Sequence, residues 1–488
     1  DYSQWGAYSV YDEDKIQELV SVDQPHYESI AIHYFTQYHL HLQLLDAVQY
    51  AHKKEVIIKG DLPIGVGRHS VDTWMYPHLF HMDMQAGAPP DAFATKGQNW
   101  SFPTYNWEIM RHDDFAWWRQ RMEHMSNYFD AIRIDHVLGF FRIWSIPMHA
   151  VEGIFGRFIP TIPLRSDDFN RAGVYFDEFR LCEPYVHDEV IRQLFGDQAS
   201  WAWENLIEGN RIRPAFRTQR LALEYFDAHP DQAFLKPAVF DLLSNVILLR
   251  DEDRPGAYHF RIGMTGSTSF GYLSDHDKRV LERMYHLYFF EWQNGLWHEE
   301  VQSKLDAIQK GSTMLICAED LGMVPAMVED VLKDREMLSL QVQRMPKAST
   351  QQFAHPSDAP YLSVVTPSTH DMSTVREWWE EDHAVTQQFY NQQLGHYGGA
   401  PFYAEPWICR EIINQHLHAP AMWAVFLLQD LMAMDAGIRR ESPLEERINV
   451  PANPDHYWNY RMHLQLEELL DATTFCQELK QLIAQSGR

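Results

Sequence analysis

The sequence predicts an α/β fold in which short parallel strands alternate with helices. Short apolar runs rich in Val, Ile and Leu recur along the chain, and helical segments separate many of them. Several of these runs end in a carboxylate residue. Alternation of strand and helix is typical of a parallel sheet, because a helical crossover returns the chain to the start of the next strand.

The first part of the chain supplies two of the expected strands. Residues 29–54 are expected to form an amphipathic helix, and 55–62 a buried strand that Pro63 closes. Gly, Pro and Asn punctuate residues 83–107, which are therefore expected to form a loop. A helix over 114–130 is expected to lead into a strand over 131–135.

The middle of the chain has a different texture, rich in charge and in helix-like segments. Helices are expected near 186–197, 217–228 and 236–250. No clear strand ending in a carboxylate is found between about 166 and 290. This region is therefore predicted to be a mostly helical insertion.

The strand and helix pattern returns in the last part of the chain. Residues 279–310 are expected to be helical, and 461–488 to form an amphipathic helix. Four further strands are expected, at 313–320, 338–343, 361–366 and 423–428. The prediction is therefore six strands, two before the insertion and four after it.

Composition excludes several function classes. The 488 residues include 41 Lys and Arg against 68 Asp and Glu, giving a net charge of −27. This balance argues against binding to nucleic acid or to anionic membrane surfaces, which reward clustered cations. Aromatic residues make up 14% of the chain, which suits either a sugar-stacking cleft or a large aromatic core.

The cysteines and the apolar segments indicate a cytoplasmic protein. Four cysteines occur without a CxxC pair, so neither a zinc ribbon nor thioredoxin chemistry is indicated. No apolar stretch of 18 residues and no signal peptide are found in the printed sequence. The chain begins with Asp1 rather than Met, so residues upstream of it are expected to be missing.

Three carboxylates stand where predicted strands end. Asp135 closes the second strand, Glu319 stands at the end of the third, and Asp371 follows the run that ends near Thr366. In a parallel β/α barrel the carboxyl ends of the strands converge on one face, where active sites are built. Crowded carboxylates raise one another's pKa. A retaining glycosidase needs one ionised nucleophile and one protonated acid, roughly 5–5.5 Å apart.

Two basic residues lie beside these acids. Arg133 precedes Asp135 by two positions, so both side chains are expected on one face of the strand, where Arg133 would keep Asp135 ionised. His370 is adjacent to Asp371 and could hydrogen-bond a sugar hydroxyl. The competing interpretation is that acids at strand ends only cap the following helices.

Metal binding is the weaker hypothesis, and the sequence predicts neither a metal nor another cofactor. The runs that could suggest a metal, His112-Asp113-Asp114 and His78 with His81, are more typical of solvated faces.

Six motifs in order resemble the signature blocks of a known family. They are GDLPIG at 60–65, GAPPD at 87–91 with GQNW at 97–100, RIDHVLGF at 133–140, AEDLG at 318–322, THD at 369–371 and RINVP at 447–451. Together they resemble the amylomaltases, the 4-α-glucanotransferases of glycoside hydrolase family 77. The GAPPD block with its downstream GQNW, and the long segment between Asp135 and Glu319, are most similar to the disproportionating enzyme 2 branch.

The resemblance implies catalytic roles for three residues. Asp135 would be the nucleophile that forms a covalent glycosyl-enzyme, and Glu319 the general acid and then the base. Asp371 would stabilise the transition state.

The resemblance also implies sugar contacts. Arg133 and His370 would contact the donor sugar, and Asn449 would make a further sugar contact. Asp91, Gln98 and Trp100 would line acceptor sites on a loop that covers the cleft. Asp61 is expected to be a structural acid behind them.

The implied activity is retaining transfer between glucans. A glucosyl or glucan unit would move from an α-1,4-glucan, maltose or maltooligosaccharide to the 4-hydroxyl of a glucan or glucose acceptor. The alternatives are an α-glucan hydrolase of the same clan and an inactive glucan-binding fragment. The GDLP block favours the transferase over the hydrolase, since α-amylases lack it in this form.

The implied fold is a (β/α)8 TIM barrel of which this chain carries strands three to eight. The first barrel part is expected in 1–165, the helical insertion in 166–290, and the second barrel part with the C-terminal helix in 291–488. The first two strands, and the starch-binding modules usual in this branch, are expected to lie upstream and outside this chain.

Overall fold

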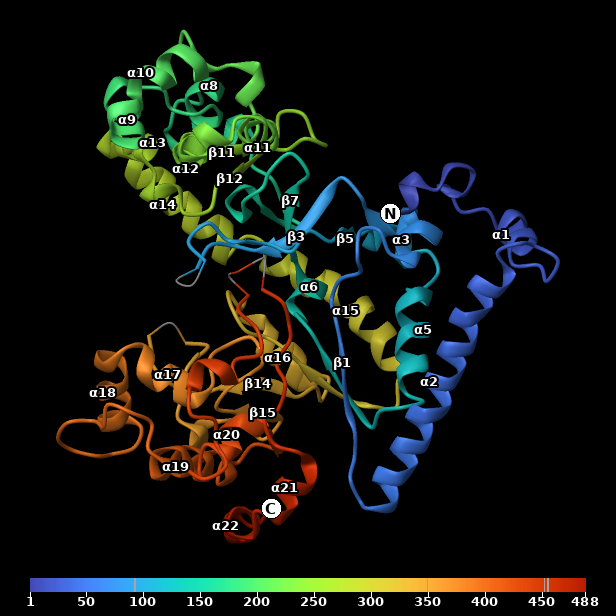
Figure 1. The fold of residues 1–488 in the computed structure, drawn as a ribbon. Coiled ribbons are helices and arrows are strands. Elements are labelled where there is room, and N and C mark those ends of the chain that lie inside the picture. Colours follow the sequence, from blue (N-terminus) through green and yellow to red (C-terminus); the bar gives the residue numbers. More distant parts are fainter. Residues whose placement is uncertain (92–93, 349, 452, 454–455) are drawn as a thin grey trace. The chain divides into compact units, whose positions relative to one another are not determined.

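The structure is a computed structural model that describes residues 1–91, 94–348, 350–451, 453 and 456–488 (Figure 1). The chain forms two compact units, each built from more than one segment. One unit comprises 1–58, 63–129 and 138–313, and the other comprises 59–62, 130–137 and 314–488. We call them unit 1 and unit 2 and describe each by itself.

Parallel strands form the centre of unit 2. A first sheet has the order β1-β6-β13, from Lys59–Leu62, Ala131–Ile134 and Leu315–Ala318. A second has the order β14-β15-β16, from Ser339–Val342, Ser363–Thr366 and Trp423–Ala424. A parallel bridge between Cys317 and Leu338 joins β13 to the residue before β14. All six predicted runs therefore contain a strand, and spatial order follows chain order.

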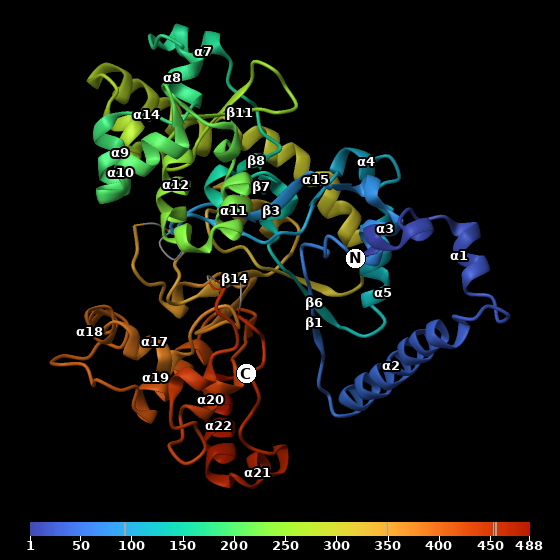
Figure 2. The ribbon, with the colours of Figure 1, turned by 45° about the horizontal axis from the view of Figure 1, so that its top comes forward.

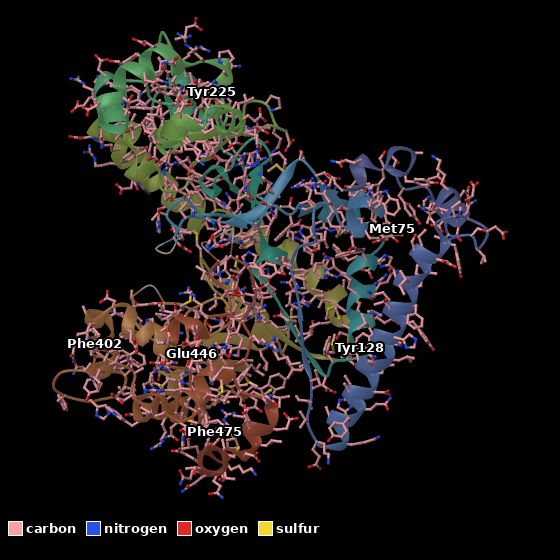
Figure 3. The ribbon with its side chains drawn as sticks, in the orientation of Figure 1. Met75, Tyr128, Tyr225, Phe402, Glu446 and Phe475 are labelled. Atoms are coloured by element: carbon pink, nitrogen blue, oxygen red, sulfur yellow. The ribbon has the colours of Figure 1, made fainter. Side chains whose placement is uncertain are left out.

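In the chain, the helices of unit 2 come after its strands β13, β15 and β16; Figure 2 labels several of these helices. They are α16 (Met327–Asp334), α17 (Val375–Glu381), α18 (His383–Gln392), α19 (Pro406–Leu417), α20 (Leu428–Met432), α21 (Leu466–Asp471) and α22 (Thr473–Ser486). The apolar faces of α17 to α22 share a core that includes Trp379, Phe389, Ile412 and Phe475, the last labelled in Figure 3. The predicted C-terminal helix is confirmed, although it is divided at Ala472.

Unit 1 contains antiparallel strands that the sequence did not predict. A sheet of order β4-β3-β7-β8 is formed by Gln98–Asn99, Met84–Ala88, Ile143–Pro147 and Arg157–Ile159. The short strands β2 (Phe80–His81) and β5 (Thr104–Tyr105) also pair. The prediction of a loop over 83–107 is therefore wrong at β3, β4 and β5. Gly87 permits this pairing, because a Cβ atom there would lie 2.1 Å from the Gln98 carbonyl oxygen.

Along the chain, the first helices of unit 1 either precede this sheet or lie between its strands β4 and β7. They are α1 (Glu13–Leu19), α2 (Tyr27–Lys53), α3 (Val71–Met75), α4 (Trp107–Arg111), α5 (Ala116–Met125) and α6 (Leu138–Phe141). The predicted helices near 29–54 and 114–130 are confirmed as α2 and α5. In α2 only Val48 is buried, and apolar side chains such as Phe35 and Tyr38 are exposed.

Residues 166–290 are mainly helical. The helices are α7 (Ser166–Ala172), α8 (Glu178–Cys182), α9 (Asp188–Phe195), α10 (Ala199–Trp201), α11 (Gln219–Ala228), α12 (Lys236–Leu243), α13 (Thr268–Gly271) and α14 (Asp275–Phe290), with α15 (Asn294–Lys310) following. Two hairpins join them, β9–β10 (Ile207–Glu208, Arg211–Ile212) and β11–β12 (Leu248–Arg250, Tyr258–Phe260). The helix expected over 236–250 therefore ends at Leu243, because Leu248–Arg250 pair in a hairpin.

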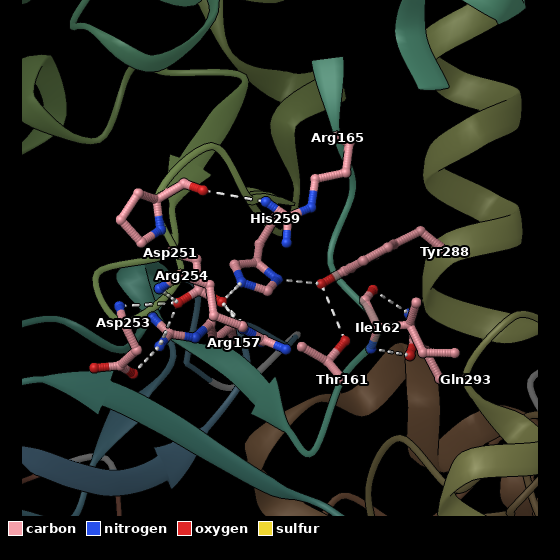
Figure 4. Close-up of polar contacts among 11 residues, drawn as sticks. Arg157, Thr161, Ile162, Arg165, Asp251, Asp253, Arg254, His259, Tyr288 and Gln293 are labelled. Atoms are coloured by element: carbon pink, nitrogen blue, oxygen red, sulfur yellow. Dashed lines mark hydrogen bonds and ion pairs between the residues drawn. The ribbon is translucent and has the colours of Figure 1, made fainter. Parts of the chain in front are cut away.

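A buried polar network fixes the second hairpin to α14 (Figure 4). His259 Nε2 lies 2.9 Å from Asp251 Oδ2, and its Nδ1 lies 2.8 Å from the Tyr288 hydroxyl. Tyr288 in turn lies 3.3 Å from Thr161 Oγ1. The side chains of His259 and Asp251 are 0% exposed, so this network is an internal support of unit 1.

All four cysteines are free. In the part of the chain that the structure describes, no helix combines the length and apolar character needed to cross a lipid bilayer.

Candidate active site

Unit 2 places two of the predicted carboxylates directly after neighbouring parallel strands. Asp135 follows β6, and its backbone N–H donates to the Leu62 carbonyl at 3.0 Å. Glu319 follows β13, and its N–H donates to the Ile134 carbonyl at 3.0 Å. These bonds extend each ladder by one residue, so both acids are fixed at the carboxyl end of the sheet.

Arg133 joins two acids at this end of the sheet. It is the register partner of Asp61 on β1, and its Nη1 lies 2.9 and 3.0 Å from the two carboxylate oxygens of Asp61. Its Nη2 lies 3.0 Å from Asp135 Oδ1. One guanidinium group therefore holds both carboxylates, as its planar fork allows. The expectation that Arg133 pairs with Asp135 agrees with this geometry.

Backbone amides hold the Glu319 carboxylate in place. The N–H groups of His136 and Leu321 donate to its two oxygens, each at 3.0 Å. His136 adopts φ +45°, in the left-handed region, which is uncommon for a residue with a side chain. The turn after Asp135 is therefore shaped so that a backbone N–H reaches Glu319.

The two strand-end acids have raised pKa values for related reasons. Burial raises the pKa of Glu319 to about 7, Arg133 opposes this shift, and the Asp135 charge adds to it. Burial also raises the pKa of Asp135 above its usual value, while Arg133 lowers it and Asp61 and Asp371 raise it. The acids are thus close enough to perturb one another's ionisation.

Asp371 lies in the loop between β15 and α17, and its environment is different. His370 Nε2 lies 3.2 Å from Asp371 Oδ2, and Asn449 Nδ2 donates to Oδ1 at 2.8 Å. These contacts hold the pKa of Asp371 below its usual value against the opposing effect of burial. The same contact raises the pKa of His370. Unit 2 therefore brings together Arg133, Asp135, Glu319, Asp371, His370 and Asn449.

Three predicted acceptor residues belong to unit 1. Gln98 lies on β4, and its Oε1 accepts a hydrogen bond of 3.0 Å from the indole Nε1 of Trp100. The Trp100 ring stacks on Phe102 with a centroid distance of 5.8 Å. Asp91 Oδ1 accepts from the Ala94 N–H at 2.6 Å. The role of these residues in acceptor binding stays a prediction.

The site contains residues that the sequence did not single out. Asp320 is 1% exposed; its carboxylate accepts from the Leu340 N–H at 2.9 Å and pairs with Lys347. Trp458 lies with its ring 5.4 Å from that of His370. Asp320 could have been noticed beside Glu319 in the AEDLG block, whereas no sequence signal marked Lys347 or Trp458.

The arrangement combines complementary acids without a cluster suited to a metal. In the described ranges, no group of three or more His, Cys, Asp or Glu side chains could hold a metal ion. Glu319 is half protonated near pH 7, whereas Asp135 pairs with Arg133. Such a set can donate a proton from one carboxyl group and attack with another.

Comparisons with known proteins agree on one family. The sequence model of the family described as 4-alpha-glucanotransferase, glycoside hydrolase family 77, matches residues 1–467. The chain is 40% identical over its whole length to a rice protein, "4-alpha-glucanotransferase DPE2" from Oryza sativa subsp. japonica, and spans 53% of that protein. Over 32% of the chain it is 33% identical to the 4-alpha-glucanotransferase of Chlamydia pneumoniae, covering 28% of it. The chain thus spans about half the length of the rice relative.

A solved structure supports the fold. The amylomaltase from Streptococcus agalactiae in complex with acarbose matches 100% of this chain and 68% of its own length, with a TM-score of 0.58 and 18% identity. The α/β, barrel-like fold expected from the sequence is therefore confirmed.

Proposed function

The chain belongs to glycoside hydrolase family 77, the 4-alpha-glucanotransferases, and from this premise we propose that it is a retaining 4-α-glucanotransferase. The observation that carries the proposal is the pairing of Glu319, whose pKa is raised to about 7, with Asp135, which Arg133 holds. The two acids stand at the ends of adjacent parallel strands, β6 and β13. A protonated acid beside a paired carboxylate is what retaining transfer requires.

The first half of the reaction breaks the donor. Glu319 protonates the glycosidic oxygen of an α-1,4-glucan while an Asp135 oxygen attacks C1, giving a covalent glycosyl-Asp135 and releasing the shortened glucan. Arg133 favours the ionised form of Asp135 before attack. Asp371 stabilises the positive charge that develops on the ring, and its low pKa keeps it ionised for this purpose.

The second half transfers the glycosyl unit. Glu319, now ionised, removes the proton from the 4-hydroxyl of the acceptor, which attacks C1 and releases Asp135 with net retention. Donors are α-1,4-glucans, maltose and maltooligosaccharides, and acceptors are glucans or glucose. The acarbose in the S. agalactiae amylomaltase, which shares this fold, is in line with a sugar-binding cleft.

Further residues are assigned to substrate contacts. Arg133 and His370 contact the donor sugar, and Asn449 makes a further sugar contact. Asp91, Gln98 and Trp100 line the acceptor sites, and the aromatic loop that carries Trp100 excludes water and so favours transfer over hydrolysis.

The six parallel strands are assigned as the third to eighth strands of the barrel, with 166–290 as a helical insertion between its two parts. The four free cysteines favour a cytoplasmic location.

Maltotriose distinguishes transfer from hydrolysis. Incubation of the 488-residue chain with maltotriose is expected to yield glucose and longer oligomers while the number of reducing ends stays constant. A steady rise in reducing ends would instead establish the alternative, an α-glucan hydrolase. No change in maltotriose, together with measurable glucan binding, would identify an inactive glucan-binding chain.

A further inference from the structure

The loop that presents Asp371 is held at both ends by one side chain. Arg344, which follows β14, is partly buried and hydrogen-bonds to residues of the segment 367–373. Its Nε donates to the Pro367 carbonyl at 3.0 Å, and its Nη2 to Ser368 Oγ at 2.7 Å. The same Nη2 donates to the Ser373 carbonyl at 2.7 Å. The guanidinium group therefore bridges the residues before and after His370 and Asp371.

Surrounding groups fix Arg344 itself. Its guanidinium carbon lies 5.1 Å from the centre of the Trp378 ring on α17, and Nη2 lies 3.3 Å from Met372 Sδ. Buried Asp430 accepts from the Val375 N–H at 2.8 Å, just after the loop. The charges of Asp430, Glu381 and Glu377 favour the cationic form of Arg344, against the effect of burial. The loop is thus attached to Arg344, which is itself surrounded by acidic side chains.

From these contacts we propose that Arg344 is a positioning residue that fixes the His370–Asp371 pair for catalysis. This inference rests on the proposed function of Asp371. Arg344 makes no hydrogen bond with His370 or Asp371, so its effect passes through the backbone of residues 367–373. The loop lacks strand pairing of its own there, and loss of the bridge frees Asp371 to move away from His370 and Asn449. The raised pKa of His370 then returns towards its ordinary value.

Lysine cannot replace this contact set. The guanidinium fork directs several N–H groups in one plane, whereas an ammonium group is a compact point charge. Arg344→Lys keeps the charge, but its ammonium group hydrogen-bonds the Pro367 and Ser373 carbonyls less well than the guanidinium group does. Arg344→Met removes the charge and the hydrogen bonds while retaining a similar length.

The test separates positioning from general destabilisation. With maltotriose, Arg344→Met is expected to lower kcat about 100-fold, the effect of a small misplacement of a reacting group, with a much smaller change in KM. Arg344→Lys should give an intermediate kcat. Guanidinium ion at millimolar concentration should partly restore kcat in Arg344→Ala, and methylammonium should not. In histidine NMR titrations, the pKa of His370 should fall in Arg344→Met and Arg344→Lys.

Arg439→Met is the matched control. Arg439 is a partly buried arginine of unit 2 that donates to the Ala404 carbonyl at 2.8 Å and makes no hydrogen bond or ion pair with residues 367–373. It should leave kcat and the His370 titration as in the unsubstituted chain.

An unchanged kcat and an unchanged His370 pKa in folded Arg344→Lys and Arg344→Met would overturn the proposal. So would a kcat loss that guanidinium does not restore, accompanied by an unchanged His370 pKa. If the unsubstituted chain transfers no glucan, the proposed function fails, yet the His370 titrations still decide whether Arg344 positions the loop.

Discussion

Glu319 and Asp371 are carboxylates near the ends of parallel strands, yet their pKa values shift in opposite directions. Glu319 accepts hydrogen bonds from two backbone N–H groups, and burial is the largest cause of its pKa shift. Asp371 receives a histidine and an amide side chain, which outweigh its burial. The difference assigns the proton donor to Glu319 and a permanent negative charge to Asp371.

Replacement of Glu319 tests this assignment. Glu319→Gln keeps the size of the side chain and cannot transfer a proton, so turnover of maltotriose should fall by about 10²–10⁴. Binding of maltoheptaose, measured by calorimetry, should persist. Glu329→Gln, an exposed position on α16, is the control and should retain full turnover. Turnover of Glu319→Gln close to that of the unsubstituted chain would remove Glu319 from the mechanism.

Asp61 is predicted to set the acidic limit of activity. Its charge raises the pKa of Asp135, so Asp61→Asn should lower that pKa. Because Asp135 must be ionised to attack, the acidic limb of kcat/KM should move to lower pH. The alkaline limb, where Glu319 loses its proton near pH 7, should move much less. Measurement of kcat/KM between pH 4 and 9 checks this, and an acidic limb that moves to higher pH would contradict it.

At the scale of elements, a buried ion pair joins α17 to the segment that carries Asn449. Arg376 Nη1 pairs with Glu446, with side chains 5% and 3% exposed, and also donates to the Arg440 carbonyl at 2.8 Å. Thr374 Oγ1 donates to Glu446 at 3.3 Å. Figure 3 labels Glu446 within unit 2. Removal of one partner leaves a charge buried without compensation.

Glu446→Ala should therefore be strongly destabilising. The free energy of unfolding in urea is expected to fall by about 3–5 kcal/mol, the usual effect of breaking a buried pair. The neighbouring Glu445 pairs with Arg440 at 2.8 Å but is 63% exposed, so Glu445→Ala should change the free energy by about 1 kcal/mol or less. If the free energy of unfolding fell equally in the two variants, the buried pair would contribute no more to stability than the exposed one.

The elements also show how far sequence patterns reach. Five of the six parallel strands were predictable because each lies in a short, largely apolar run, and the acids after β6 and β13 because they end such runs. For β1 the prediction is only partly right, since the apolar residues Val56 and Ile57 lie before the strand and are exposed. The strand β3 was missed because Gly87 and the Gly and Pro residues that follow it are typical of a loop. The strand forms by pairing with β7, more than fifty residues away, which a local sequence pattern does not reveal. Arg344 was not predictable, since most of its hydrogen bonds are to a loop whose path only the folded chain defines.

At the scale of the whole molecule, buried histidines link stability to pH. Burial lowers the pKa of His416 to about 4, and that of His259 is also lowered. The unfolded chain binds protons near pH 6.5, before the folded one does, so these groups oppose folding as the pH falls. Carboxyl groups whose pKa is raised in the folded chain favour folding as the pH falls, which opposes the effect of the histidines. The histidine contribution is therefore measured by comparing a histidine variant with the unsubstituted chain.

His416→Gln isolates the histidine contribution. His416 is 1% exposed, and its shift corresponds to about 3 kcal/mol that is lost between pH 6.5 and 4. The variant lacks this loss, so its urea unfolding free energy should fall less over that range. A parallel pH dependence in the two proteins would contradict the assignment. His418→Gln, at an exposed neighbouring position, is the control.

The central sheet of unit 2 has a consequence for the speed of folding. Arg133 on β6 reaches Asp61 across 72 residues, and His136 just after β6 reaches Glu319 across 183 residues. Bringing such distant segments together costs chain entropy before any contact compensates for it. Helices such as α14 and α19 are local and can form early, whereas β1, β6 and β13 must wait for long loops to close. Refolding from urea should therefore show helical signal well before the slow recovery of maltotriose turnover.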